Sequence, residues 1–204
     1  MKTKIYLIRN AECFGNIEKI LGEKTNYDIT AKGYEMIDSL TEYFKTKMIS
    51  SIYSSNSTIC LETVDKLAKE LNIEVKKEKD LREKYFGIYD GKKWAEILEA
   101  DPKLKKYRKK EIEILGIPNQ ESTKHVEDRM IKVITQIAND NLGQNVLIVS
   151  HGVAIETFLR AVVGISNADE KEKYFQKNGA INYIEYDEDL DEFEVKEVAK
   201  IIYK

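Results

Sequence analysis

The sequence predicts a three-layer α/β sandwich, in which a mostly parallel central sheet is flanked by helices on both sides. Three short runs of β-favouring apolar residues, at 4–8, 49–53 and 145–149, are typical of strands that are covered on both faces. Apolar residues between and after these runs recur with helical spacing. Strands that alternate with amphipathic helices indicate a largely parallel sheet.

The length and charge of the chain limit the classes of protein to which it can belong. Its 204 residues fit one domain, 1–204, with a substantial core. The 33 basic and 36 acidic residues give a net charge of −3, which argues against a nucleic-acid partner. No apolar run has the length of a membrane helix or of a signal-peptide core. We therefore expect a cytoplasmic protein with no nucleic-acid and no membrane partner.

Cysteine and histidine are scarce in this chain. The cysteines are Cys13 and Cys60, and the histidines are His125 and His151. These counts exclude a zinc-finger framework and a disulfide scaffold, and we expect neither a metal nor a cofactor. We interpret His125 as a solvated residue of a helix. The sequence leaves the oligomeric state open.

The predicted helices follow the strands in order. Thr30 is of a residue type that caps helix N-termini, and it precedes a stripe formed by Met36, Ile37, Leu40 and Phe44. Three further stripes have the same spacing: Leu61, Val64, Leu67, Ala68 and Leu71; Val126, Met130, Val133, Ile134 and Ile137; and Ile155, Phe158, Leu159 and Val162.

Two segments depart from this alternation. Residues 91–119 have a helical pattern that is weakly apolar and rich in Lys and Glu, with a proline near each end. We interpret them as a small helical cap inserted over the sheet. Residues 180–203 alternate around an acidic turn, which predicts a hairpin or a pair of edge strands.

Polar residues follow each of the three strongest strands. They form the clusters Arg9-Asn10-Ala11-Glu12, Ser54-Ser55-Asn56-Ser57 and Ser150-His151-Gly152. Because ligands of open α/β sheets bind beyond the carboxyl ends of the strands, we expect these clusters to meet. A helix that begins near Val153 would direct free N–H groups to the same place, and Arg9 adds a planar donor fork. These features predict a site for an anion.

The motifs around these clusters resemble those of the histidine phosphatase superfamily, the phosphoglycerate mutase-like proteins. The family opens with Arg-His-Gly-Glu and then an Asn, to which Arg9, Glu12 and Asn16 are similar. The segments ITAKG, YSSNSTICLET and ESTKHVEDR resemble later family segments. LREKYFGIYDG resembles the family's Leu-x-Glu-x-x-Phe-Gly region and contains Glu83, while VSHGVAI resembles the second histidine motif and contains His151. The resemblance extends over essentially the whole chain.

This resemblance implies in-line phosphoryl transfer to a histidine, followed by hydrolysis or transfer to a second acceptor. It implies that Arg9, Asn16 and His151 bind the phosphoryl group. It also implies that Glu83 is the acid for the leaving oxygen. A small phosphorylated or anionic molecule is therefore the expected partner, and the family implies no metal.

The chain departs from the family at three positions. Asn10 stands where the nucleophilic histidine is expected, Ala11 stands for the following glycine, and Ile59 stands for a second phosphate-binding arginine. A carboxamide nitrogen is not basic, so Asn10 should not form a phospho-enzyme. Loss of a charge-assisted phosphate contact costs roughly 1.5–3 kcal/mol, or about ten- to a hundredfold in affinity. We expect a catalytically impaired protein that retains a phosphate-ester or anion pocket.

Two alternatives remain open from the sequence. The protein could be an active phosphomonoester phosphatase or mutase that uses His151, Glu83 and water or a surrogate nucleophile. Cys13 lies where the family has a hydroxyl residue near the phosphate, and a thiolate there could be that nucleophile, although a buried free cysteine usually has a packing role. Alternatively, the protein is a non-catalytic interaction scaffold.

Overall fold

The computed structural model describes residues 1–22, 27–106, 117–165 and 172–203. Its centre is a six-stranded sheet with the strand order β3-β2-β4-β1-β5-β6. The four strands from β3 to β1 are parallel, and β5 and β6 are antiparallel to their neighbours. The strands are β1 (Lys2–Arg9), β2 (Ser51–Ser54), β3 (Val75–Lys77), β4 (Asn145–Ser150), β5 (Ile181–Asp187) and β6 (Glu192–Lys200).

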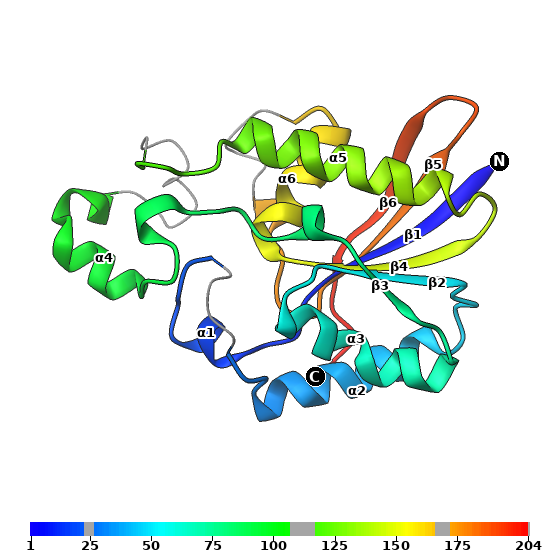
Figure 1. Cartoon of the computed structure of the whole chain (residues 1–204), viewed down its shortest axis with the longest axis horizontal. Coiled ribbons are helices and arrows are strands. Elements are labelled where there is room, and N and C mark those ends of the chain that lie inside the picture. Colours follow the sequence, from blue (N-terminus) through cyan, green and yellow to red (C-terminus); the bar gives the residue numbers. More distant parts are fainter. Residues whose placement is uncertain (23–26, 107–116, 166–171, 204) are drawn as a thin grey trace.

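Helices cover both faces of this sheet. Figure 1 shows α2 and α3 on one face and α5 and α6 on the other. The α-helices are α1 (Phe14–Ile17), α2 (Ala31–Phe44), α3 (Thr58–Leu71), α4 (Trp94–Ala100), α5 (Thr123–Asn139) and α6 (Gly152–Val162). The 3-10 helices are η1 (Lys79–Leu81), η2 (Gly87–Tyr89) and η3 (Pro102–Lys106). The predicted three-layer sandwich is therefore confirmed.

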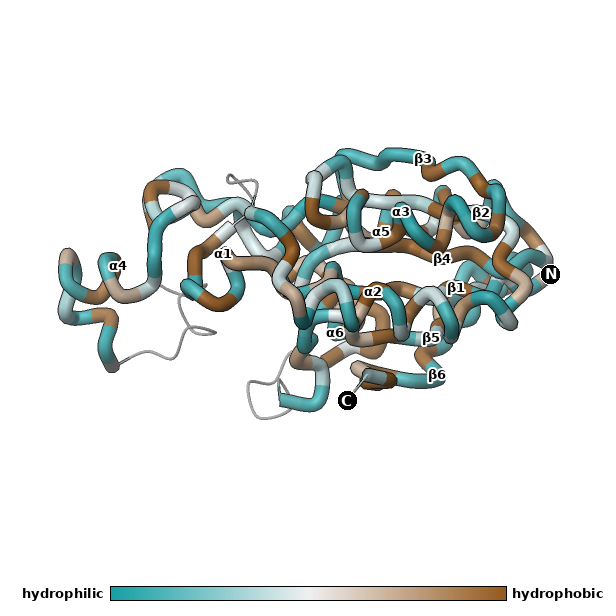
Figure 2. Tube along the Cα trace, turned by 90° about the horizontal axis from the view of Figure 1, so that it is seen from below, coloured by the Kyte–Doolittle hydropathy of each residue, from teal (hydrophilic) through white to brown (hydrophobic). Residues whose placement is uncertain are grey.

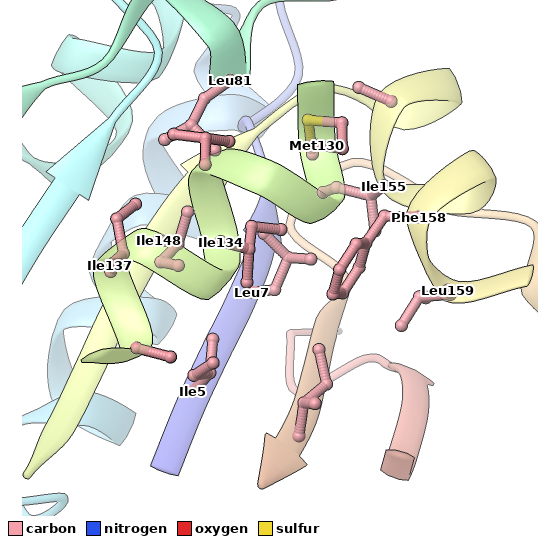
Figure 3. Close-up of a cluster of buried hydrophobic side chains, with 14 of the residues drawn as sticks. Ile5, Leu7, Leu81, Met130, Ile134, Ile137, Ile148, Ile155, Phe158 and Leu159 are labelled. Atoms are coloured by element: carbon pink, nitrogen blue, oxygen red, sulfur yellow. The ribbon is translucent and has the colours of Figure 1, made fainter. Parts of the chain in front are cut away.

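Each face of the sheet has its own apolar core. Ile5, Leu7 and Ile148 point to α5 and α6, where they pack with the helical stripes shown in Figure 3. Ile8 and Leu147, which alternate with them along the strands, pack against α2 and α3. This alternation explains why the strands appear in the sequence as continuous apolar runs, and Figure 2 shows the hydrophobic colour along β4.

The helix and hairpin predictions agree with the structure. Thr30 caps α2, because its Oγ1 accepts a hydrogen bond of 2.9 Å from the backbone N–H of Gly33. Strands β5 and β6 form the predicted hairpin, but only β6 is an edge strand, since β5 pairs with β1. The sequence reasoning missed β3, whose three residues Val-Lys-Lys are too few and too polar to form a recognisable run.

The described part of the predicted cap consists of α4 and η3, and residues 107–116 lie outside the described residues. Figure 1 shows α4 beyond the carboxyl ends of the parallel strands rather than over a face of the sheet, which corrects its expected position. Ile97 and Leu104 of the cap form a small apolar core with Leu21 and Phe86, which lie outside the cap. Val153, in the first turn of α6, packs against this core and so joins the cap to the end of the sheet.

Candidate functional site

The three polar clusters meet at the carboxyl ends of β1, β2 and β4, as predicted. Arg9 is the parallel partner of Ser150, and Ser54 is the partner of Val149 on the other side of β4. The backbone N–H of Asn10 continues the pairing beyond the strands with a bond of 3.0 Å to the carbonyl of Ser150. The strand order therefore brings together side chains that are more than 140 positions apart.

Arg9 is the cation of this site. A Cβ atom at Gly152 would lie only 3.2 Å from Cζ of Arg9, so the glycine allows the guanidinium to lie against the start of α6. Nη1 donates a 2.6 Å hydrogen bond to the carbonyl of Gln176, whereas the buried Nε has no hydrogen-bond partner in the structure. Burial lowers the pKa of Arg9 and the Glu83 carboxylate opposes that shift, but a guanidinium stays charged at neutral pH. A buried cationic donor without a partner is suited to an anion.

Asn10 is buried at the end of β1, and its side chain is bonded to its own chain. Nδ2 donates a hydrogen bond of 2.8 Å to the carbonyl of Ala11. The backbone carbonyl of Asn10 accepts bonds from the N–H of Gly179 and from Nδ2 of Asn178. Asn10 is thus a fixed part of the wall of the site.

The Asn16 side chain is fixed by bonds to its oxygen. Oδ1 accepts hydrogen bonds from the backbone N–H of Cys13 at 3.0 Å, from its Sγ at 3.2 Å and from Nδ2 of Asn178 at 2.8 Å. Since all three donors are on the oxygen side, the amide nitrogen of Asn16 is the side on which a ligand oxygen would be bound. Burial raises the pKa of the Cys13 thiol, which therefore stays protonated at neutral pH.

Ile59 makes the aligned arginine position apolar. Its side chain is partly buried and packs against a cluster that includes Ala11, Cys13 and Met36. This packing is the ordinary role of an isoleucine beside a core, and it provides no donor to the site.

His151 immediately precedes α6, and its side chain is almost completely buried. Its Nε2 atom lies 3.1 Å from Oγ of Ser55, 3.3 Å from Oγ of Ser57 and 3.4 Å from Sγ of Cys60. The polar residues after β2 thus surround the imidazole of the residue that follows β4. The sequence predicted that these two loops meet, but it did not predict a role for Ser57 or Cys60.

Glu83 lies at the N-terminus of α6. Oε2 accepts a hydrogen bond of 3.1 Å from the backbone N–H of Val153, and Oε1 accepts bonds of 2.9 Å from Ala154 and 2.8 Å from Lys84. The sequence predicted that an external anion would use the N–H groups at this helix end. That expectation needs correction, because the carboxylate of Glu83 already binds two of them.

A buried ion-pair network supports the segment that carries Glu83. Glu121 accepts bidentate hydrogen bonds from Arg82 at 2.8 and 2.7 Å and a 2.8 Å bond from Nε of Arg129. Arg129 also donates to the carbonyls of Asp80, Arg82 and Glu83. Burial raises the pKa of Glu121, but these hydrogen bonds dominate and lower it from 4.5 to about 2.

His125 stands at the edge of that network, with Nδ1 3.0 Å from Oε1 of Glu121. Its side chain is 64% exposed, which agrees with its interpretation as a solvated helical residue.

Sequence reasoning missed Asn178, whose only local signal is the glycine that follows it. Gly179 adopts a φ of +67° just before β5, a conformation that favours glycine.

Two further findings concern residues 1–22, 27–106, 117–165 and 172–203, which the structure describes. These residues contain no group of three His, Cys, Asp or Glu side chains arranged to hold a metal ion. Across the same ranges, no helix is both long enough and apolar enough to cross a bilayer.

Comparison with known proteins relates the chain to one family. The sequence model of the histidine phosphatase superfamily (branch 1) matches residues 5–199. A candidate phosphoserine phosphatase 2 from Hydrogenobacter thermophilus is 27% identical over 162 residues, which is 79% of each chain. The structure of YhfR from Bacillus stearothermophilus is similar with a TM-score of 0.86 and 25% identity, over 98% of both chains.

Phosphoserine phosphatase from Entamoeba histolytica is a further structural relative, solved in two forms. Its complex with 3-phosphoglyceric acid has a TM-score of 0.80 and 20% identity, over 98% of both chains. Its histidine-to-alanine mutant in complex with phosphoserine has a TM-score of 0.79 and 23% identity, over 97% of both chains. Similarity at these identities shows a shared fold.

Proposed function

Because the chain belongs to the histidine phosphatase superfamily, we propose that it binds a phosphate ester in the site around Arg9 and His151 without forming the family's phosphohistidine. The observation that carries this proposal is Asn10, a buried amide at the position expected for the nucleophile. Its nitrogen lone pair is delocalised and its N–H donates to the carbonyl of Ala11, so Asn10 supplies no nucleophile.

We place the protein in the cytoplasm, where its two free cysteines would stay reduced.

Three groups support anion binding in this proposal. Arg9 supplies a charged donor whose Nε is buried and unsatisfied in the structure. Asn16 supplies an amide nitrogen whose orientation is set by the three bonds to its oxygen, and His151 supplies an imidazole. Since Ile59 provides no second guanidinium, we expect affinity about ten- to a hundredfold below that of a pocket with both arginines.

The relatives suggest a class of ligand. The Entamoeba enzyme is described with 3-phosphoglyceric acid, and its histidine-to-alanine mutant is described with phosphoserine. That mutant holds a phosphorylated ligand although one of its histidines has been replaced. A small phosphorylated carboxylic acid is therefore the ligand class that we propose to test first.

Thermal unfolding with orthovanadate and with phosphoserine tests the binding. A ligand that binds only the folded state at about a hundred times its dissociation constant adds about 2.7 kcal/mol to the free energy of unfolding and raises Tm. We expect the stabilisation to be lost in Arg9→Ala and partly kept in Arg9→Lys, which preserves the charge. No stabilisation of the unmodified protein would overturn the proposal.

The missing nucleophile has its own test. Restoring the family residues with Asn10→His and Ala11→Gly should create a phosphohistidine and raise the hydrolysis of p-nitrophenyl phosphate at least about a hundredfold. Asn10→Gln with Ala11→Gly is the matched control, because it enlarges the side chain without adding a basic nitrogen. If the unmodified protein hydrolyses the ester as fast as the restored variant, the proposed impairment is wrong.

A further inference from the structure

The imidazole of His151 lies beside the hydroxyl or thiol groups of Ser55, Ser57 and Cys60, and of these three residues Ser57 alone is partly exposed. Ser55 and Cys60 are completely buried. Ser57 is partly exposed, and its Oγ lies 3.3 Å from Nε2 of His151. Ser57 and His151 thus form a pair in which the hydroxyl of a partly exposed serine faces an imidazole nitrogen.

Ser57 stands at a helix N-cap but does not make the hydrogen bond that is usual for a serine there. Ser57 is the N-cap residue of the 14-residue helix α3, yet its side chain makes no capping hydrogen bond. A serine at this position normally accepts a bond from the first turn of the helix. Here the hydroxyl faces His151 instead, at the end of the sheet where Arg9 lies.

We propose that Ser57 accepts a phosphoryl group from a phosphate monoester, with His151 as the general base. This inference rests on the phosphate-ester site of the proposed function. Oγ of Ser57 forms a bond to phosphorus while the bond from phosphorus to the leaving oxygen breaks. The hydroxyl proton passes to Nε2 of His151, and the leaving oxygen takes a proton from solvent. The products are phosphoserine and the free alcohol.

The surroundings favour both the step and its product. Arg9 supplies positive charge for the phosphoryl oxygens, since burial does not remove the charge of a guanidinium. A phosphoserine at the N-cap of α3 would carry its negative charge at the positive end of the helix, which stabilises it. Oγ of the buried Ser55 lies 3.1 Å from the same Nε2.

The experiment incubates the full chain with p-nitrophenyl phosphate, quenches it in acid and measures the intact and peptide masses. Phosphoserine survives acid whereas phosphohistidine does not, so the quench separates the two chemistries. We expect one phosphoryl adduct, located on Ser57, in the unmodified protein and in the control Ser39→Ala, whose residue lies on α2. In Ser57→Ala the adduct should disappear and release of p-nitrophenol should fall about a hundredfold. Ser57→Thr retains a hydroxyl and should restore part of both signals.

Thermal shifts with orthovanadate on the same samples distinguish the possible failures. Stabilisation by orthovanadate without any adduct on Ser57 would overturn the serine proposal and leave the phosphate-ester site intact. An adduct on another residue would also overturn it. Absence of both the adduct and the stabilisation would overturn the proposed function itself.

Discussion

Nδ2 of Asn178 donates a hydrogen bond of 2.8 Å to Oδ1 of Asn16, and so links the segment before β5 to helix α1. The same amide also bonds to the carbonyls of Asn10 and Ala11. One side chain therefore connects the two polypeptide segments that form one wall of the candidate site, and together with Cys13 it orients the Asn16 amide.

Replacing Asn178 should weaken ligand binding beyond its effect on the fold. Asn178→Ala removes one of the three donors that hold Oδ1 of Asn16, so the amide is oriented less firmly and the affinity for orthovanadate should fall several-fold, about 1 kcal/mol. Calorimetric titration at a temperature where the variant is fully folded measures this change. Unfolding in urea is the control, and a lowered stability with unchanged affinity would mean that Asn178 has a structural role alone.

Glu83 should stabilise helix α6 from outside the helix. Its carboxylate accepts the N–H groups of Val153 and Ala154, so Glu83→Ala leaves two donors without partners. We expect a loss of about 1 kcal/mol in the free energy of unfolding, measured in urea. Glu83→Gln keeps an acceptor oxygen and should lose roughly half as much. Equal stability of the alanine variant and the unmodified protein would contradict this assignment.

Glu121 should make the protein sensitive to acid. Its pKa is about 2 in the folded protein and 4.5 ordinarily, so the folded state favours the carboxylate. The stability that it contributes is fully present above about pH 4.5 and is lost as the pH falls towards about 2. Glu121→Gln leaves the Arg129 guanidinium buried without its counter-charge and should cost about 3 kcal/mol at neutral pH.

Urea unfolding at a series of pH values checks the Glu121 prediction. In Glu121→Gln the decline of stability between about pH 4.5 and about 2 should be smaller than in the unmodified protein. Glu62→Gln, at an exposed glutamate of α3, is the matched control and should leave both the stability and its pH dependence unchanged. Identical acid profiles for the two variants would show that the network does not act through Glu121.

The parts of this fold that sequence predicts are those with strong periodic signals. Runs such as 145–149 are apolar on both sides because α2, α3, α5 and α6 bury both faces of the sheet. The burial of these strands therefore produces a continuous apolar run that can be recognised in the sequence. Strand β3 is partly to fully exposed along its three residues, so the same rule gives no signal there. The meeting of Arg9, Ser57 and His151 followed from the rule that carboxyl ends of parallel strands share one edge.

The features of the site that sequence reasoning missed are the contacts of Glu83 with α6 and the role of Asn178, and both depend on contacts between distant segments. Glu83 binds N–H groups about 70 positions away, and Asn178 contacts a residue 162 positions away. No local pattern encodes such a partner, because the residues next to Glu83 in the sequence do not distinguish a glutamate that binds a distant helix from an exposed glutamate. For the same reason the sequence did not indicate that Glu83 binds the N–H groups of Val153 and Ala154, which were expected to be open to an external anion.

The thiol of Cys13 should be unreactive in the folded protein at neutral pH. Burial raises the pKa of its thiol, and its Sγ bonds to Oδ1 of Asn16 at 3.2 Å, so little thiolate forms at neutral pH. Cys13→Ser should leave phosphoryl transfer and orthovanadate binding unchanged within about twofold, whereas iodoacetamide should modify the unfolded protein much faster than the folded one. Loss of the phosphoryl adduct in Cys13→Ser would identify the thiol as the nucleophile instead.

Ile59→Arg should strengthen the site for phosphate. The side chain is partly buried beside Ala11 and Cys13, so a guanidinium there loses some apolar packing but gains access to the end of the sheet where Arg9 lies. A charge-assisted contact contributes about 1.5–3 kcal/mol, which corresponds to a rise of about ten- to a hundredfold in affinity for phosphate or orthovanadate. Ile59→Met is the control for the lost packing, because it is flexible and uncharged. Isothermal titration measures both variants, and a gain that is equal in the two would show that space rather than charge limits binding at this position.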